Sequence, residues 1–163
     1  MKPRAVALGI LYSILVVLFI WISVSLGKVK PPSCDEIFSY YHSKGGNYGE
    51  FIEQTESGFN RMPPFYFLVT KAIFSEQDFI FKCRMLSLVF ALLNLFFLYK
   101  ISRFWHNFDA SLLLSMGCLL ASPYFLEYSI DARPYSLCLL LLTIFIFKIL
   151  VFEQRKNGGR IPK

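Results

Sequence analysis

The stretch SCDEIFSYYHSKGGNYGEFIEQTESGFNRMPPFYFLVTKAIF, residues 33 to 74, is the only long polar segment of the chain and lies between strongly apolar runs. It opens with two adjacent carboxylates, Asp35 and Glu36, and its last part begins with two prolines followed by three aromatic residues. An acidic pair directly after an apolar run of membrane-spanning length is unusual for a simple connector. We therefore expect this segment to hold a functional site at a membrane surface.

The whole chain has the composition of a membrane protein. Of its 163 residues, 55% are hydrophobic, and the mean hydropathy is +0.50. Soluble domains of this size are seldom so apolar. The net charge of +6 alone would be compatible with a nucleic-acid partner. The basic residues, however, lie at the ends of apolar runs and not on one face, so we exclude nucleic acid and attribute these charges to membrane topology.

Four apolar runs predict four transmembrane helices in a single membrane module covering residues 1–163: about 5–27, 79–101, 110–126 and 135–152. The first run has 23 residues without a charge, enough to cross a hydrocarbon core. The alternative for this run, a cleaved signal peptide, has an apolar core of only about 7–15 residues. Basic side chains near the ends of the other runs are expected to extend toward headgroups: Lys82, Arg84, Lys100 and Lys148.

The distribution of charge predicts the orientation of these helices. Basic residues at the N-terminus, after the second run and in the C-terminal tail fall on one side. The segment 28–84 instead carries seven basic and seven acidic residues, which balance. By the positive-inside rule, we expect both termini in the cytoplasm and the loop 28–78 on the outer face of the cell (inner) membrane.

Within the outer loop, the pattern predicts two short helices separated by a glycine-rich turn. The first covers residues 35–42, with Ile37, Phe38 and Tyr41 on one side. The second covers residues 64–74, which are apolar but too few to cross a membrane, so we expect a helix lying in the interface. The predicted fold class is an all-α membrane protein with amphipathic interfacial helices in its first outer loop.

The four cysteines include no CxxC pair, and the two histidines lie far apart in the predicted topology. A disulfide between Cys34 and Cys83, both expected on the outer side, is one alternative, and free thiols are the other. No metal-ligand spacing is present. The sequence leaves metal dependence undetermined, with a divalent metal cofactor as an open alternative.

Three ionisable residues are expected near the outer membrane surface: Asp35, Glu36 and Arg133. Charged groups at that depth have a free-energy cost unless they are paired with an opposite charge or take part in function. A carboxylate there can accept a proton from a nucleophile, and an arginine can hold a phosphate through two parallel hydrogen bonds. The combination suits transfer of a group from a lipid phosphate.

Each of these residues also has a structural interpretation. The carboxylates can be solvated or can cap a helix. Arg133 can pair with Glu127 or Asp131. Pro63 and Pro64 can simply start a helix, and the aromatic residues after them can belong to an interfacial belt.

Three motifs, in this order, resemble a known family: CDEIFSYY after the first run, RMPPFYFLVTKAIF later in the loop, and SPYFLEYSIDARPYSL between the third and fourth runs. They are similar to the N-terminal part of the GT-C glycosyltransferases. The resemblance is strongest to the dolichyl- or polyprenyl-phosphate-mannose-protein mannosyltransferase superfamily, whose bacterial branch includes lipopolysaccharide sugar transferases and aminoarabinose transferases. The stretch KCRMLSLVFALLNLFFLYKISR also resembles that family's second span.

The resemblance implies roles for individual residues. Asp35 would be the catalytic base, and Glu36 would support it or contact a metal or the substrate. Arg61 would replace the Lys or His that the family usually has just before its two prolines. The other implied substrate-binding residues are Pro63, Pro64 and Tyr66 beside the lipid-linked donor, and Asp131, Arg133 and Tyr135 on the second outer link.

The function so implied is inverting transfer of a sugar from a polyprenyl-phosphate donor to a protein, lipid or glycan acceptor on the outer face. Family members are several times longer, so the chain resembles only their N-terminal portion. The expected partners are therefore the lipid bilayer, the donor, and a C-terminal portion or partner subunit. The alternative function is a non-catalytic four-helix membrane protein that binds a lipid or a partner subunit. The sequence names neither the sugar, the acceptor nor the oligomeric state.

Overall fold

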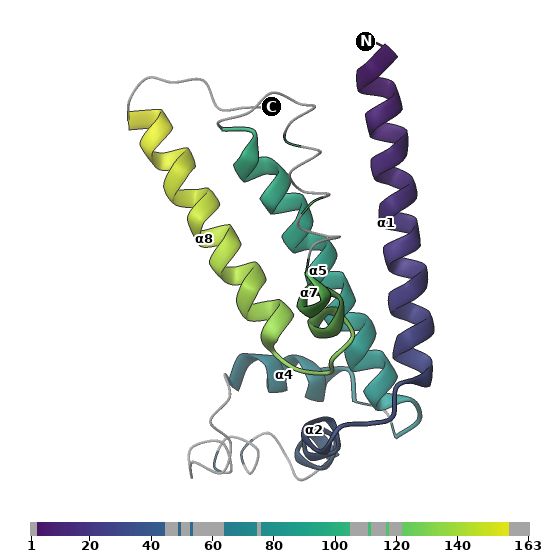
Figure 1. The fold of residues 1–163 in the computed structure, drawn as a ribbon. Coiled ribbons are helices and arrows are strands. Elements are labelled where there is room, and N and C mark those ends of the chain that lie inside the picture. Colours follow the sequence, from purple (N-terminus) through teal and green to yellow (C-terminus); the bar gives the residue numbers. More distant parts are fainter. Residues whose placement is uncertain are drawn as a thin grey trace.

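The computed structural model describes residues 3–44, 49, 53, 64–74, 76–104, 111, 117 and 122–156. Over these ranges every regular element is a helix (Figure 1): α1 (Pro3–Val29), α2 (Cys34–Lys44), α4 (Pro64–Ala72), α5 (Phe79–Ser102), α7 (Pro123–Ser129) and α8 (Tyr135–Lys156). The all-α fold class predicted from the sequence is confirmed for this part of the chain.

Three of these helices are long and apolar enough to cross a membrane: Val6–Val29 in α1, Phe79–Ser102 in α5 and Tyr135–Lys156 in α8. Only 11%, 33% and 22% of their most apolar windows are buried within the chain, so most of their apolar side chains face outward. So large an apolar surface needs an apolar environment, which a bilayer provides. Three of the predicted spans are thus present as helices of suitable length.

The predicted span 110–126 lies mostly outside the described residues. Its last residues belong to a separate short helix, because α7 starts at Pro123. Ser122 is extended and caps α7, its hydroxyl accepting a hydrogen bond from the Phe125 N–H at 3.2 Å. Proline suits the first turn of a helix, where its missing N–H removes no hydrogen bond. A helix start at Pro123 therefore replaces the helix end predicted at Leu126.

The long helices define two ends of the bundle. α1 finishes, and α5 and α8 begin, at the end where α2 and α4 also lie, which we call the loop end (Figure 1). α5 and α8 run in the same direction, and α8 packs mainly against α5. α1 and α7 pack on α5 through a core that contains Phe19, Leu88 and Phe125. The first turn of α1 and the last turn of α8 lie at the opposite end.

Helix α2 has its polar side facing inward. Its buried side chains are all polar: Glu36, Ser39 and Ser43. Ile37, Phe38 and Tyr41 share one face, as predicted, but this face points outward, with exposures of 42%, 37% and 66%. The predicted helix over residues 35–42 is confirmed and extends to Lys44.

Helix α4 lies across the loop end below α8 (Figure 1). Tyr66, Phe67 and Thr70 are fully buried, whereas Phe65 is largely exposed. The Thr70 and Ser43 hydroxyls lie 3.3 Å apart and join α4 to α2. A helix was predicted over residues 64–74, and the helix observed ends at Ala72.

One expectation about a single residue is wrong. Arg84 does not extend toward headgroups; its side chain is only 3% exposed because Glu36 holds it inside. Lys82, two positions earlier, is exposed, and its contact with headgroups stays a prediction. The disulfide alternative is also not formed, since Cys34 is an exposed free thiol and Cys83 a buried one, packed in a core with Phe79.

Candidate active site at the loop end

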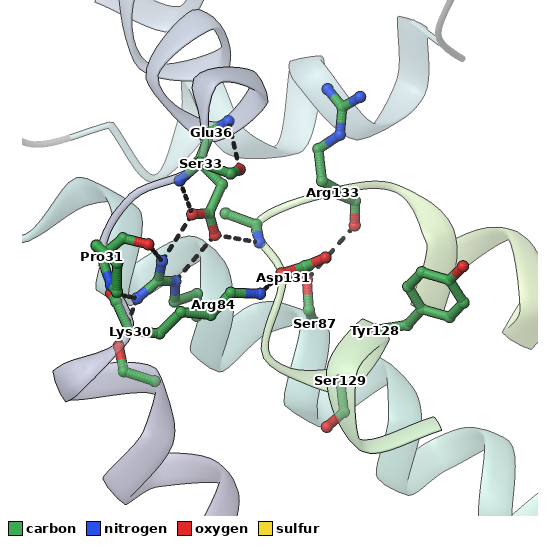
Figure 2. A network of polar contacts seen from close by, with 12 residues as sticks. Lys30, Pro31, Ser33, Glu36, Arg84, Ser87, Tyr128, Ser129, Asp131 and Arg133 are labelled. Carbon is green, nitrogen blue, oxygen red and sulfur yellow. Dashed lines mark hydrogen bonds and ion pairs between the residues drawn. The ribbon is translucent and has the colours of Figure 1, made fainter. Parts of the chain in front are cut away.

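The centre of the loop end is a buried ion pair between α2 and α5. Arg84 Nη2 lies 2.6 Å from Glu36 Oε2, and Arg84 Nε donates to Glu36 Oε1 at 2.9 Å (Figure 2). The two side chains are 3% and 0% exposed. Two parallel bonds of this kind are the geometry in which an arginine and a carboxylate bind most strongly, and they offset the cost of burying both charges.

Arg84 also satisfies the backbone at the end of α1. Its Nη1 donates to the carbonyl oxygens of Gly27 and Lys30 at 2.8 and 2.7 Å, and its Nη2 donates to that of Pro31 at 3.2 Å. The last carbonyls of a helix have no partner within the helix, and Pro31 and Pro32 supply no N–H to replace it. Arg84 therefore closes α1 and fixes the direction in which the chain enters α2.

Glu36 is bonded on all sides. Its carboxylate accepts from the Ser33 N–H at 3.0 Å and from the Ala132 N–H at 2.9 Å, besides Arg84. In turn, the Ser33 hydroxyl accepts a hydrogen bond from the Glu36 N–H at 3.3 Å. The two reciprocal bonds form a capping box at the start of α2. Burial opposes ionisation of Glu36, but the bonds from Arg84, Ala132 and Ser33 outweigh it and lower the pKa of this carboxyl. Glu36 is thus an ionised structural anchor and not a free proton acceptor.

The neighbouring carboxylate makes a second, more open contact. Asp35 Oδ2 lies 2.8 Å from Arg133 Nη2, although the two residues are 98 positions apart. The Asp35 side chain is 64% exposed and that of Arg133 only 9%. The Arg133 guanidinium lies over the Tyr135 ring, 5.8 Å from its centre. Because Asp35 and Glu36 are adjacent, the buried Glu36 anchor holds Asp35 at this position.

Arg133 does not pair with either local carboxylate. Asp131 forms an ion pair with Lys30, which joins the link before α8 to the end of α1. Glu127 is exposed, without an ion-pair partner in the part of the chain that the structure describes. The local pairing considered for Arg133 is therefore replaced by a long-range pair with Asp35.

The remaining predicted site residues lie in different environments. Tyr135 is 41% exposed beside the guanidinium. Tyr66 is entirely buried, and its burial raises the pKa of the phenol. Pro64 is the first residue of α4. Arg61 and Pro63 lie outside the described residues.

An apolar cavity of about 370 Å³ adjoins the Asp35–Arg133 pair through Tyr135. Its walls come from α5, α7 and α8 and include four aromatic residues, with Tyr124, Phe125 and Tyr128 beside Tyr135. The Tyr128 and Tyr135 ring centres are 4.9 Å apart. The site thus combines a charged part at the loop end with an apolar part between the helices.

Three residues that organise the site were not among the predicted ones: Lys30, Ser33 and Arg84. Ser33 precedes Glu36 by three positions, which is the spacing of a capping box and could have been read from the sequence. A basic residue early in an apolar helix, as Arg84 is, signals a buried partner as well as it signals contact with headgroups. No local pattern identifies the Ala132 N–H as the third partner of Glu36.

Comparisons of the chain with protein-family models, curated proteins and solved structures return no match. Among the described residues, no group of three or more His, Cys, Asp and Glu side chains is placed to hold a metal ion. The site is therefore characterised by its own geometry, a carboxylate–guanidinium pair at the end of an apolar helical bundle.

Proposed function

We propose that this protein is a membrane glycosyltransferase of the GT-C type, or the N-terminal portion of one, that uses a polyprenyl-phosphate-linked sugar as donor. The observation that carries the proposal is the Asp35–Arg133 contact of 2.8 Å at the end of three apolar helices. It combines a carboxylate that can take a proton with a guanidinium suited to phosphate. The motif resemblance supports the same chemistry.

In the proposed reaction, an acceptor hydroxyl or amine attacks the anomeric carbon of the donor sugar. A bond forms between the acceptor atom and that carbon, and the acceptor proton passes to the Asp35 carboxylate. The bond from the anomeric carbon to the phosphate oxygen breaks, and polyprenyl phosphate leaves with the electron pair. Arg133 stabilises the charge on this leaving group, which then needs no proton. A single displacement inverts the configuration at the sugar carbon.

The ion pair suggests how donor binding prepares the site. Without donor, Arg133 binds Asp35 Oδ2, an oxygen that would accept the proton. The buried Nε of Arg133 has no hydrogen-bond partner among the described residues, so the guanidinium has donor capacity left. A donor phosphate would compete with Asp35 for Arg133 and free the carboxylate oxygen for the acceptor.

The apolar cavity beside Tyr135 supports a lipid-linked donor in particular. With about 370 Å³ and apolar walls, it offers room for the first isoprene units of a polyprenyl chain. A phosphate at Arg133 and a chain passing Tyr135 and Tyr128 would together use both parts of the site.

We further propose four spans, with the loop end at the outer face of the cell membrane and both termini in the cytoplasm. The Lys and Arg distribution supports this orientation. Exposed apolar side chains on α2 and α4, including Phe38, Phe65 and Leu68, support a position of these helices in the interface. The proposed site would then face lipid-linked donors in the outer leaflet.

Replacement of Asp35 tests the proposal. In membranes that contain the protein and a panel of labelled polyprenyl-phosphate sugars, Asp35→Asn should lower the transfer rate about 10²–10⁴-fold, because a positioned base is lost. Donor binding, measured by photo-crosslinking, should persist. Glu127→Gln is the matched control, since it removes an exposed carboxylate of α7 and should leave the rate unchanged.

Arg133→Gln should weaken donor binding as well as transfer, and Arg133→Lys should restore part of the binding. Transfer by Asp35→Asn at the rate of the unmodified protein would contradict the catalytic role. Donor binding without turnover in the unmodified protein would instead favour the non-catalytic lipid-binding alternative.

A further inference from the structure

A second cavity, of about 570 Å³, is separate from the Asp35–Arg133 pair. It lies between the end of α1, Tyr40 of α2 and the start of α5, and neither Asp35 nor Arg133 lines it. Its apolar walls are Tyr40, Phe79, Ile80 and Phe81. The proposed transfer reaction does not use this cavity.

Most charges around this cavity are already neutralised. Arg84 is bound to Glu36, and Lys30 to Asp131. Glu76 lies 3.1 Å from the ammonium group of Lys44, and this contact raises the Lys44 pKa. These three pairs leave no net charge for a ligand to neutralise.

Two lining residues of opposite charge have no such partner. Lys28, in the last turn of α1, contacts only the Phe81 ring, 5.9 Å from its centre, and no carboxylate in the described part of the chain. Asp78 precedes α5 in a left-handed conformation, and its side chain makes no capping hydrogen bond. Both side chains are exposed. The cavity thus presents one unpaired cation and one unpaired anion between aromatic walls.

The position of the cavity along the helices indicates which chemical groups lie near these two charges. The membrane-spanning stretch of α1 ends at Val29, next to Lys28, and that of α5 begins at Phe79, next to Asp78. Both charges therefore lie at the boundary of the apolar zone, where phospholipid headgroups are found. A phospholipid with a primary amine carries an anionic phosphate and a cationic ammonium in one headgroup.

We propose that this cavity binds the headgroup of an aminophospholipid such as phosphatidylethanolamine. The phosphate binds Lys28, the ammonium binds Asp78, and the glycerol region packs on Phe79 and Phe81. Phosphatidylcholine has the same charges but no N–H to donate, and phosphatidylglycerol has no cation. The site should therefore prefer phosphatidylethanolamine to both.

Native mass spectrometry of the detergent-solubilised protein, with each of the three phospholipids added, tests this proposal. The unmodified protein should retain phosphatidylethanolamine best. Lys28→Gln should weaken binding of all three about tenfold or more, because each has the phosphate. Asp78→Asn should reduce the preference for phosphatidylethanolamine over both phosphatidylcholine and phosphatidylglycerol, because the ammonium loses its carboxylate partner.

Lys82→Gln is the control, since Lys82 is an exposed lysine in the first turns of α5 that does not line the cavity. The proposal is overturned if Lys82→Gln and Lys28→Gln have equal effects, or if phosphatidylglycerol binds as well as phosphatidylethanolamine. Displacement of the lipid by equimolar glycerophosphoethanolamine would show a site for the free headgroup and would also overturn it. Each outcome is independent of sugar transfer, because the assay contains no donor.

Discussion

At the scale of single residues, the two adjacent carboxylates have opposite environments. Glu36 is fully buried and bonded to Arg84, Ser33 and Ala132, whereas the Asp35 side chain is 64% exposed and pairs with Arg133. A buried, fully bonded carboxylate has no free lone pair for an incoming proton donor. We therefore expect Glu36 to hold Asp35 in position, and Asp35 to act as the proposed base.

Loss of the Glu36 charge should destabilise the loop end. Glu36→Gln leaves the Arg84 guanidinium buried without a counter-charge, which typically costs about 3–5 kcal/mol. We expect a lower thermal unfolding temperature in detergent micelles, with Glu127→Gln unchanged as a control. Combining Glu36→Gln with Arg84→Met should recover part of the loss, because no charge then remains buried. An unfolding temperature unchanged by Glu36→Gln would show that the pair has no structural role.

The same pair predicts a pH dependence of stability. The Glu36 pKa is lowered from its ordinary value of 4.5 in the folded protein. The stabilisation is therefore fully present above about pH 4.5 and is lost as the pH falls through the lower folded value. Unfolding temperatures measured between about pH 3 and 6 should fall at the acid end. Glu36→Gln should flatten this fall, and an equally steep fall in that variant would assign the effect to other carboxylates.

At the scale of elements, α2 depends on its first turn. The capping box between Ser33 and Glu36 satisfies two backbone N–H groups, at 3.0 and 3.3 Å, where the chain leaves Pro31 and Pro32. α2 also turns its polar side inward, so its apolar face contributes little to packing within the chain. Its position depends on polar contacts at the start, on the Tyr40 ring packed against Phe74 and Phe79, and on the Ser43–Thr70 contact near the end.

Removal of the capping hydroxyl should therefore loosen α2 selectively. Ser33→Ala is expected to cost about 0.5–2 kcal/mol and to speed hydrogen exchange of the α2 amides. Ser13→Ala is the control, since the Ser13 hydroxyl only donates to the Gly9 carbonyl within α1 at 3.0 Å. Equal acceleration of exchange in α5 would show that the effect is global unfolding and not a local loss of the cap.

At the scale of the whole molecule, α1, α5 and α8 carry the site at one end, and the orientation of that end in the membrane can be measured. Cys34 is an exposed free thiol at the loop end, whereas Cys83 is buried. In intact cells, a membrane-impermeant maleimide should label Cys34, because we place the loop end outside. Cys138, near the start of α8, is a second exposed free thiol, so the experiment is done in a Cys138→Ser background, where Cys34→Ser should abolish the labelling. When Lys156→Cys is added to the Cys34→Ser protein, the new thiol should react only after the cells are permeabilised. Labelling of position 156, but not of Cys34, in intact cells would show that the proposed topology is inverted.

The sequence by itself determined the helical architecture and the three helices that are long and apolar enough to cross a membrane. Run length and hydropathy are local properties, so α1, α5 and α8 could be predicted within a few residues of their bounds. The helices α2 and α4 could be predicted for the same reason, from apolar spacing and from Pro64. The outward orientation of the apolar face of α2 could not be predicted in this way, because an apolar stripe on a helix predicts burial within the chain unless the membrane is considered.

Only the tertiary structure decided which charges meet. Arg133 has two carboxylates within six positions, yet it pairs with Asp35, 98 positions away, because Lys30 already holds Asp131. Glu36 likewise finds Arg84 at a separation of 48 positions. Every arginine carries the same charge, so the local sequence does not indicate which carboxylate pairs with which arginine. Packing α1 and the link before α8 against α5 brings the chosen groups within bonding distance, and the buried pair then persists because separating it would leave unpaired charges inside.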